Sequence, residues 1–106
     1  MKRETLKGHL DLLLLATIAA GEAHGYLVGR RLAEASGGIL ELPEGTLYPA
    51  LHRLESKELL ASDWATVGGR RRRVYSLTPL GEQELAKGRG EWGTFARAVD
   101  SVLDTV

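Results

Sequence analysis

Four consecutive arginines, Arg70–Arg73, directly follow the glycine pair Gly68-Gly69. A guanidinium group is a planar fork of N–H donors that grips a phosphate in bidentate fashion. A cluster of such groups on one short segment favours contact with a polyanion such as the backbone of a nucleic acid. The alternative is a solvated hairpin tip, whose arginines bind nothing.

The spacing of the arginines divides them between two faces. Successive side chains of a strand point to opposite sides, so Arg70 and Arg72 are expected on one face and Arg71 and Arg73 on the other. Trp64 is expected opposite Arg73, where ring and guanidinium can stack as a cation–π pair that contributes ~0.5–1 kcal/mol. We therefore expect phosphate contacts from Arg70, Arg71 and Arg72, and a partly structural role for Arg73.

The overall composition restricts the class of protein. Of the 106 residues, 43% are hydrophobic and 26% charged, which indicates one globular domain with a core. The 14 basic and 14 acidic residues balance, so a basic surface can exist only locally. The chain contains no cysteine, which excludes disulfides and thiolate chemistry and fits a reducing cytoplasm.

Neither a membrane segment nor a signal peptide is expected. The apolar run from Leu12 to Ala20 is shorter than the ~20 residues that span a bilayer. The N-terminal sequence MKRETLKGH has no apolar stretch of the kind found in signal peptides. These features predict a cytoplasmic protein with no membrane partner.

No catalytic or metal site is expected either. The chain lacks an H-E-x-x-H zinc motif, a G-x-S-x-G nucleophile motif and a phosphate-binding glycine loop before a helix. The histidines His9, His24 and His52 lie on different segments without the spacing of metal ligands. We therefore expect no enzyme, no metal and no cofactor.

The elements that must position the arginines begin with three predicted helices. Apolar residues recur at helical spacing over residues 4–21, and again over 24–38, where Gly37-Gly38 ends the pattern. A third helix is expected over 42–58, with Leu47 and its helical neighbours facing inward. Each helix is short, so their apolar faces must pack against one another.

Pro49 restricts where the third helix begins. A helix that begins near Thr46 would have Pro49 in its first turn, where a missing N–H costs nothing. A helix that begins at Pro43 would include Pro49 in its interior and imply a local distortion. The spacing of the apolar residues is compatible with both.

Residues 59–77 predict a β-hairpin that carries the arginines. A two-residue turn at Gly68-Gly69 sets the register on the face expected to pack on the core, where the pairs are Leu60 with Leu77, Ser62 with Tyr75, and Trp64 with Arg73. A longer turn would shift every pair.

A long terminal helix is expected over residues 78–106, with Thr78 as its N-cap and Pro79 at its first position. Apolar residues at a seven-residue step form a stripe typical of a dimerisation helix. The stripe comprises Leu85, Trp92, Phe95, Val99, Val102 and Val106. Glycines at 88, 90 and 93 leave open whether this stretch is a regular helix.

Three helices followed by a hairpin are the pattern of a winged helix-turn-helix domain. We therefore predict a mostly α chain with a DNA-binding domain over residues 1–78 and a dimerisation helix over 79–106. The third helix is then the candidate for insertion into the major groove of double-stranded DNA.

The chain resembles the PadR family of bacterial transcriptional regulators. The residues that carry the resemblance are HGY at His24–Tyr26, GTLYPALHRLE at Gly45–Glu55, the pair Leu59-Leu60, and GRRRRVYSLTPLGEQEL at Gly69–Leu85. The resemblance implies a homodimeric winged-helix repressor of the short branch, which has a single C-terminal helix. Some members of that branch bind flat aromatic compounds at the dimer interface.

The candidate DNA contacts come from the third helix and the segment before the second helix. Small residues at the start of the third helix allow close approach of the backbone, and polar side chains on its outer face can reach base edges or phosphates. Together with the arginines of the hairpin, the candidates are His24, Gly45, Thr46, Tyr48, Pro49, His52 and Arg53. Tyr48 lies between the inner and outer faces and can instead pack. Gly25 and Tyr26 are expected to pack the start of the second helix.

Trp92 suggests a ligand site. In a symmetric dimer it would face its own copy, and two indoles could enclose a planar aromatic effector. The first helix would supply the other wall, with Gly8, Asp11 and Leu12 as candidates. The simpler interpretation is an aromatic residue in the dimer core.

Two other functions fit the same pattern. A winged-helix module that binds protein would bind DNA weakly and with little salt dependence, whereas phosphate contacts make binding steeply salt-dependent. A small-molecule binding protein without a promoter role would depend on Trp92 and not on the arginines.

Overall fold

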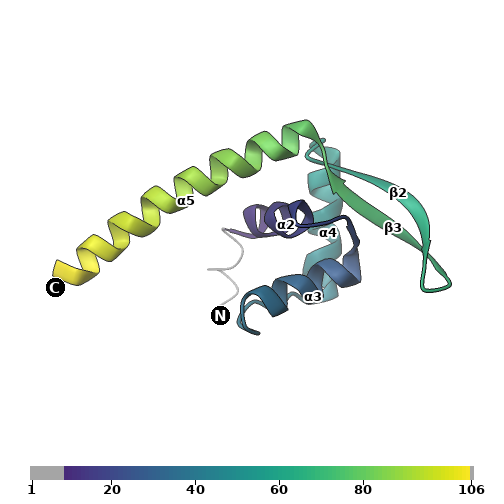
Figure 1. Cartoon of the computed structure of the whole chain (residues 1–106), viewed down its shortest axis with the longest axis horizontal. Coiled ribbons are helices and arrows are strands. Elements are labelled where there is room, and N and C mark those ends of the chain that lie inside the picture. The colour runs from purple at the N-terminus through teal and green to yellow at the C-terminus, as the bar shows by residue number, and fades with distance from the viewer. Residues whose placement is uncertain (1–8, 106) are drawn as a thin grey trace.

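The computed structural model describes residues 9–105 and confirms a mostly helical fold with a small antiparallel sheet. The elements in chain order are α2 (Leu10–Ala19), β1 (Ala23–His24), α3 (Gly25–Ala35), α4 (Glu44–Ser56), β2 (Leu60–Val67), β3 (Arg70–Leu77) and α5 (Pro79–Thr105). Figure 1 shows α2, α3 and α4 grouped together, with the β2–β3 hairpin projecting to one side and α5 extending to the other. The predicted start of the first helix, residues 4–8, lies outside the described residues.

The core forms around α2, which is apolar on nearly every side and packs against α3, α4, β3 and α5. Burial of apolar surface on this scale is the main stabilising term of a small domain. The most deeply buried side chains are Leu14, Val28, Leu51, Leu54, Leu60 and Tyr75. Leu85 also belongs to this core, at 6% exposure, so the first turns of α5 complete the winged-helix body.

Helices α3 and α4 form the helix-turn-helix. α3 ends in a Schellman motif, in which the Gly38 N–H donates to the carbonyl of Ala33 and Gly37 has a φ of +64°. α4 begins at Glu44 with Pro43 as its N-cap, so the earlier of the two predicted starts is the correct one. Pro49 therefore lies inside the helix, where it cannot donate a hydrogen bond to the carbonyl four residues before it.

The hairpin has the predicted two-residue turn. Gly68 and Gly69 have φ values of +58° and +80°, as a type I′ turn requires. The pairing runs from Leu60 opposite Leu77 to Val67 opposite Arg70, which confirms the predicted register. The prediction that Trp64 packs on the core is wrong: its side chain is 57% exposed because the hairpin projects beyond the helices at that point.

The sheet has a third strand that the sequence analysis did not predict. β1 pairs antiparallel with β3 through Ala23 opposite Tyr75 and His24 opposite Val74. It makes β3 the central strand in the order β1-β3-β2. Arg31 on α3 donates from Nη1 to the carbonyl of Gly21 at 2.8 Å, which holds the loop before β1 in place.

Helix α5 is continuous through Gly88, Gly90 and Gly93. Its 27 residues correspond to a length of about 40 Å. The radius of gyration is 15.0 Å, compared with about 13 Å for a compact chain of this length, because the second half of α5 extends away from the body.

The start of α5 is joined closely to the end of α4. Thr78 is the predicted N-cap: it accepts from the Gly81 N–H at 3.0 Å, and its hydroxyl donates to the carbonyl of Glu58 at 2.6 Å. Its own N–H donates to the carbonyl of Leu59. A Cβ atom added at Gly81 would lie 2.1 Å from that same Leu59 carbonyl oxygen. Only glycine allows this approach.

The substitution Gly81→Ala is therefore expected to lower the free energy of unfolding by about 2 kcal/mol. Overpacking against backbone atoms costs up to ~3 kcal/mol, and the better helix propensity of alanine returns ~1 kcal/mol. Gly90→Ala on the same helix is the matched control, since an added Cβ meets nothing within 4 Å there. Gly90→Ala should raise stability by ~1 kcal/mol. Urea denaturation of both variants measures these opposite shifts, and a stable Gly81→Ala protein would contradict the packing argument.

Candidate nucleic-acid interface

The outer face of α4 carries most of the residues expected to contact DNA. Gly45, Pro49, His52 and Arg53 are exposed, and Thr46 is half-buried. An added Cβ at Gly45 would meet nothing within 4 Å, so the surface at the start of α4 is open. A backbone that lies open at a helix start can approach another molecule closely.

Tyr48 packs between α3 and α4, as the alternative interpretation allowed. A Cβ atom at Gly25, the buried first residue of α3, would lie 2.4 Å from the Cε1 atom of the Tyr48 ring. The absence of a side chain at Gly25 thus makes room for the tyrosine ring. Tyr48 remains half-buried and keeps part of its surface on the outer side of α4.

Arg53 has a partner that was not predicted. Its Nη2 atom forms a 2.5 Å ion pair with Oδ1 of Asp11 on α2. Both side chains are partly exposed, so this surface pair contributes little to stability. Arg53 is therefore held beside α2, and Asp11 holds an arginine rather than an open ligand site.

His24 is the N-cap of α3 as well as a residue of β1. Its Nδ1 atom accepts a hydrogen bond from the Leu27 N–H at 3.3 Å. Burial, followed by the positive charges of Arg72 and Arg31, lowers the pKa of the His24 imidazole. The ring is therefore neutral at pH 7, so Nδ1 stays an acceptor and Nε2 carries the proton that can be donated to a phosphate.

Tyr26 is 54% exposed, so the prediction that it packs is wrong. It is the second residue of α3, and its ring stacks on His24 with centroids 6.3 Å apart. The stacking holds the phenol at the surface, where its hydroxyl can donate to an anion. An exposed tyrosine next to a helix start was the signal that the sequence offered and that we assigned to packing.

The arginines of β3 divide between two faces, as predicted. Arg71 and Arg73 place their Cζ atoms 5.6 and 5.3 Å from the centroid of the Trp64 ring, within cation–π range. Arg71 was expected to contact phosphates only, and its contact with Trp64 gives it a structural part as well. Arg70 and Arg72 lie on the other face, where Arg72 comes close enough to His24 to affect its pKa.

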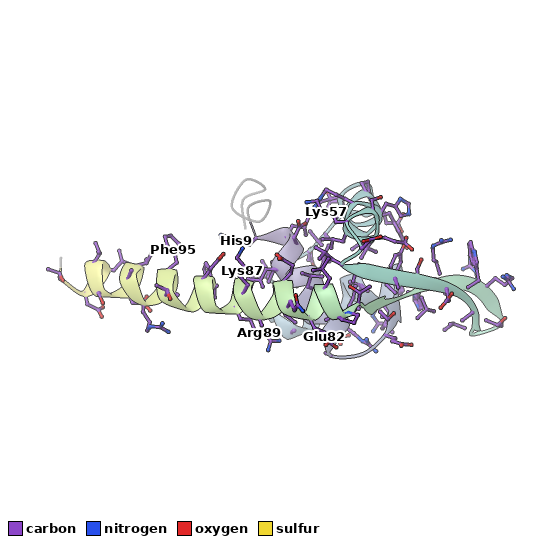
Figure 2. The ribbon with its side chains drawn as sticks, turned by 90° about the horizontal axis from the view of Figure 1, so that it is seen from above. His9, Lys57, Glu82, Lys87, Arg89 and Phe95 are labelled. Carbon is purple, nitrogen blue, oxygen red and sulfur yellow. The ribbon has the colours of Figure 1, made fainter. Side chains whose placement is uncertain are left out.

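The second half of α5 exposes a row of apolar side chains. Leu85 does not belong to this row because it lies in the core, and Val106 lies outside the described residues. The exposed members are Trp92, Phe95, Val99 and Val102, joined by Leu103. Figure 2 shows Phe95 on the part of α5 that runs beyond the rest of the molecule. The rings of Trp92 and His9 meet edge to face at 5.1 Å.

The residues expected to form a ligand site with Trp92 do not line one pocket with it. Leu12 lies against α5, where an added Cβ at Gly88 would come within 2.8 Å of its Cδ1 atom. Leu12 and Asp11 line a groove of about 440 Å³ between α2 and α5 that does not include Trp92. Gly8 lies outside the described residues.

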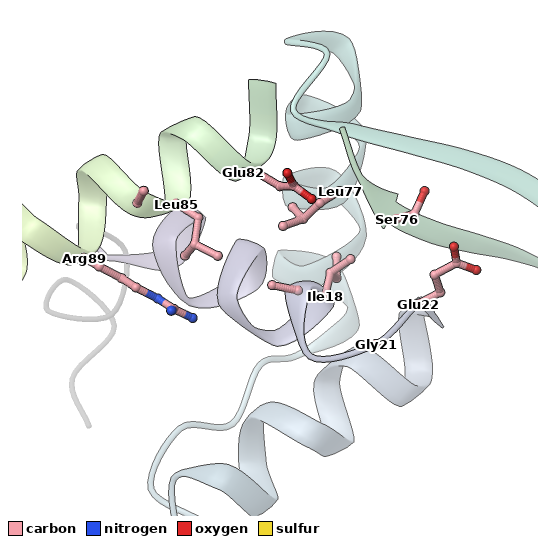
Figure 3. Close-up of a pocket in the computed structure, with 10 residues that line it drawn as sticks. Ile18, Gly21, Glu22, Ser76, Leu77, Glu82, Leu85 and Arg89 are labelled. Carbon is pink, nitrogen blue, oxygen red and sulfur yellow. The ribbon is translucent and has the colours of Figure 1, made fainter. Parts of the chain in front are cut away.

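A second groove, of about 600 Å³, lies between α2, β3 and the first turns of α5. Ile18, Leu77 and Leu85 form its apolar part, and Arg89 and Glu22 lie at opposite ends of it (Figure 3). Its mixed charges favour no single class of ligand. Among residues 9–105, no three His, Asp or Glu side chains are grouped as metal ligands. None of the helices described is long and apolar enough to cross a membrane.

Comparison with known proteins identifies the family. Residues 14–87 match the sequence model of the transcriptional regulator PadR-like family. The transcriptional regulator Rv3488 of Mycobacterium tuberculosis is 38% identical over 97 residues, which cover 92% of this chain and 88% of that protein. An uncharacterised protein of Lysinibacillus sphaericus is 27% identical over 105 residues, 98% of this chain and 96% of its own length.

Solved structures agree with this assignment. A PadR family transcriptional regulator from Eggerthella lenta has a TM-score of 0.83 and 32% identity, and covers 97% of this chain and 88% of its own. A PadR-like regulator from Bacillus cereus has a TM-score of 0.84 and 27% identity, with 94% and 96% coverage. The resemblance first drawn from the residues is thus confirmed over most of the chain. With its helix-turn-helix, its arginine-bearing wing and these relatives, the chain belongs to the PadR-like family of DNA-binding transcriptional regulators, which are not enzymes.

Proposed function

We propose that the protein is a homodimeric repressor that occupies a pseudo-palindromic operator and is released by a ligand. The observation that carries this proposal is the placement of Arg70 and Arg72 on an exposed wing beside the helix-turn-helix. α4 enters a major groove, and the arginines grip phosphates or the adjacent minor groove. In a two-fold dimer the two copies of α4 lie about one helical turn, or ~34 Å, apart.

Dimerisation is assigned to the exposed apolar row on α5. An apolar patch of this length on a projecting helix is unusual for a monomer and typical of an interface. We propose that residues 1–78 form the DNA-binding part and 79–106 the dimerisation helix, with the first turns of α5 shared between them. A two-fold axis along the row would bring each copy of Trp92 and Phe95 against the partner helix.

The salt dependence of DNA binding tests this function. Gel shifts with the promoter region of the protein's own gene, over a series of salt concentrations, should give a log affinity that falls with log salt by about 0.9 per phosphate contact. A protein-interaction module would bind weakly and with a flat salt dependence. Weak, salt-insensitive binding would therefore contradict the proposal.

The effector is proposed to be a planar aromatic molecule held between the two Trp92 side chains. The half-exposed indole, with Phe95 at 6.1 Å, offers the flat apolar surface that such a ligand requires. The ligand releases DNA only if it binds better to a dimer whose reading helices are wrongly spaced.

The substitution Trp92→Ala should weaken binding of a planar dye by about tenfold or more, since stacking on two indoles is lost. Fluorescence titration of the dye against parent and variant measures this. The same titration by Arg89→Ala, an exposed change on the same helix, is the control. Equal affinity for Trp92→Ala and parent would remove Trp92 from the effector site.

A further inference from the structure

The wing is packed only at its base. On the face of the hairpin that meets the helices, Leu60 and Tyr75 are buried, but the next pair along, Trp64 and Arg73, is exposed. A two-stranded ribbon without packing on either face is free to bend. The angle between the wing and α4 must therefore be fixed by something other than the apolar core.

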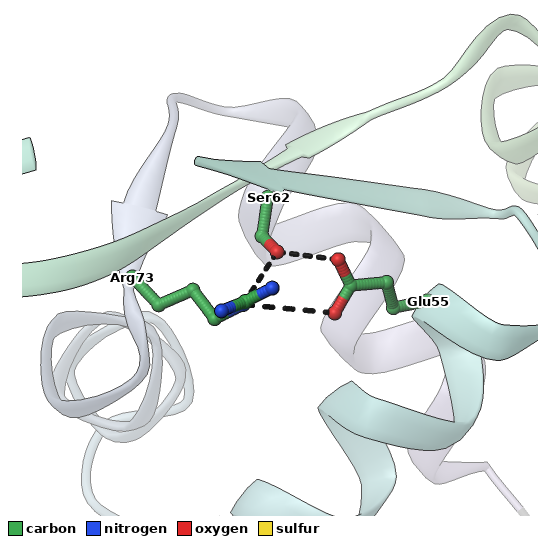
Figure 4. Close-up of polar contacts among 3 residues, drawn as sticks. All are labelled: Glu55, Ser62 and Arg73. Atoms are coloured by element: carbon green, nitrogen blue, oxygen red, sulfur yellow. Dashed lines mark hydrogen bonds and ion pairs between the residues drawn. The ribbon is translucent and has the colours of Figure 1, made fainter. Parts of the chain in front are cut away.

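A polar network joins the wing to the last turn of α4 (Figure 4). The Ser62 hydroxyl on β2 donates to Oε2 of Glu55 on α4 and accepts from Nε of Arg73 on β3 at 2.7 Å. The same Arg73 nitrogen lies 3.9 Å from Oε1 of Glu55. One carboxylate thus holds both strands of the wing.

The network extends outward along the hairpin. Arg73 contacts the Trp64 ring, and Arg71 contacts the same ring one step further out. Glu55 also raises the pKa of the buried Tyr75, after the larger effect of burial, which places its charge close to the base of the sheet. From α4 to the outer wing, the contacts run in order through Glu55, Arg73 and Trp64.

We propose that Glu55 is a positioning residue that fixes the wing against the recognition helix and withholds Arg73 from phosphates, so that the protein discriminates its operator from other DNA. This inference rests on the proposed function. Non-specific binding comes almost entirely from phosphate contacts, so a neutralised arginine weakens it. A wing held at one angle fits its phosphates only when the base contacts of α4 are also in register.

The test compares two duplexes of equal length, one selected from a random pool by the parent protein and one with its sequence scrambled. The substitution Glu55→Gln keeps the shape and the acceptor for Ser62 but removes the charge that holds Arg73. Binding to the scrambled duplex should rise roughly tenfold, and its salt slope should steepen by about two units, one freed Arg73 in each subunit. The ratio of specific to non-specific affinity should fall roughly tenfold.

Glu58→Gln is the matched control. Glu58 follows the same helix, is exposed, and forms no ion pair with any residue between 9 and 105. It loses the same charge without freeing an arginine, so its affinity ratio should stay at the parent value. Addition of Arg73→Gln to Glu55→Gln should return the salt slope to that of the parent, and thermal melting checks that every variant folds.

The outcomes separate the inference from the function beneath it. If the parent selects no duplex, the proposed function fails. If the parent selects one and Glu55→Gln leaves the affinity ratio and the salt slope unchanged, the role of Glu55 is overturned. A fall in the ratio that Arg73→Gln does not reverse, or that Glu58→Gln reproduces, overturns it as well. A purely structural Glu55 would lower the melting temperature and leave both binding quantities in place.

Discussion

Replacement of Arg70 and Arg72 together by glutamine is expected to lower affinity for the operator on the order of 10³-fold near 0.1 M salt. Each dimer loses four phosphate contacts, two on each wing, and each contact contributes about 0.9 to the slope of log affinity against log salt. The slope should therefore fall by three to four units, about 0.9 for each lost contact. Gel shifts or fluorescence anisotropy over a range of salt concentrations measure both quantities.

These two arginines are chosen because their face of the wing is free of the Trp64 stack. Arg71 and Arg73 contact the ring, so their replacement would also alter the shape of the hairpin. Arg72 lies close enough to His24 to lower its pKa, which puts it beside the start of α3. A phosphate there would meet Arg72, the Nε2 proton of His24 and the positive end of the helix dipole together.

The matched control replaces Arg89 and Arg97 on α5 by glutamine. Both are exposed and the change removes the same charge from the chain. If net charge alone governed DNA binding, the two double variants would weaken it equally. The position of the charge is the relevant quantity in our proposal, so the α5 variant should bind with nearly the parent affinity and slope. Equal losses would show that the wing has no special part.

Local turn chemistry is what made much of this fold predictable. Two adjacent glycines determine a type I′ turn, and that turn alone sets every pair of the hairpin. Thr78 followed by Pro79 likewise predicted the start of α5 correctly. In both cases the signal lies within a few residues of the structure that it determines.

The features that were missed depend on contacts between distant segments. β1 has only two residues and exists because β3 lies beside it, so no periodicity reveals it. The ion pair of Asp11 with Arg53 joins positions 42 residues apart. Glu58 adopts a φ of +63° at the end of α4, a position that glycine usually occupies, so the sequence carries no sign of the turn there.

The candidate site was predicted as a surface but not as a set of contacts. Helical spacing placed Gly45, Pro49 and His52 on the outer face of α4, and the structure has all of them exposed. Spacing within one element cannot tell which outward side chain meets a neighbouring element. For this reason Tyr48, Arg53 and Glu55 acquired partners on α3, α2 and the wing only when the elements were brought together.

The substitution Phe95→Asp should convert the dimer to monomers and abolish tight operator binding. Phe95 is 58% exposed in the single chain, on the part of α5 that no other described element covers. Burial of a phenylalanine contributes about 1.5–3 kcal/mol, and a two-fold interface contains it twice. Loss of about 3–6 kcal/mol raises the dissociation constant of the dimer roughly 10²–10⁴-fold, before the cost of a buried carboxylate is added.

Thr94→Asp is the control that separates this effect from added charge. Thr94 is the preceding residue and is also exposed, but it lies about 100° around the helix from Phe95, on the side away from the apolar row. Sedimentation at a series of concentrations should find dimers for Thr94→Asp and monomers for Phe95→Asp, with both variants keeping the helical circular dichroism of the parent. DNA affinity should follow the dimer, because a monomer contacts one half-site and loses the avidity of two linked reading helices, a factor of roughly 10² or more. A Phe95→Asp protein that remains dimeric, or a monomer that still binds the full operator tightly, would place the interface elsewhere.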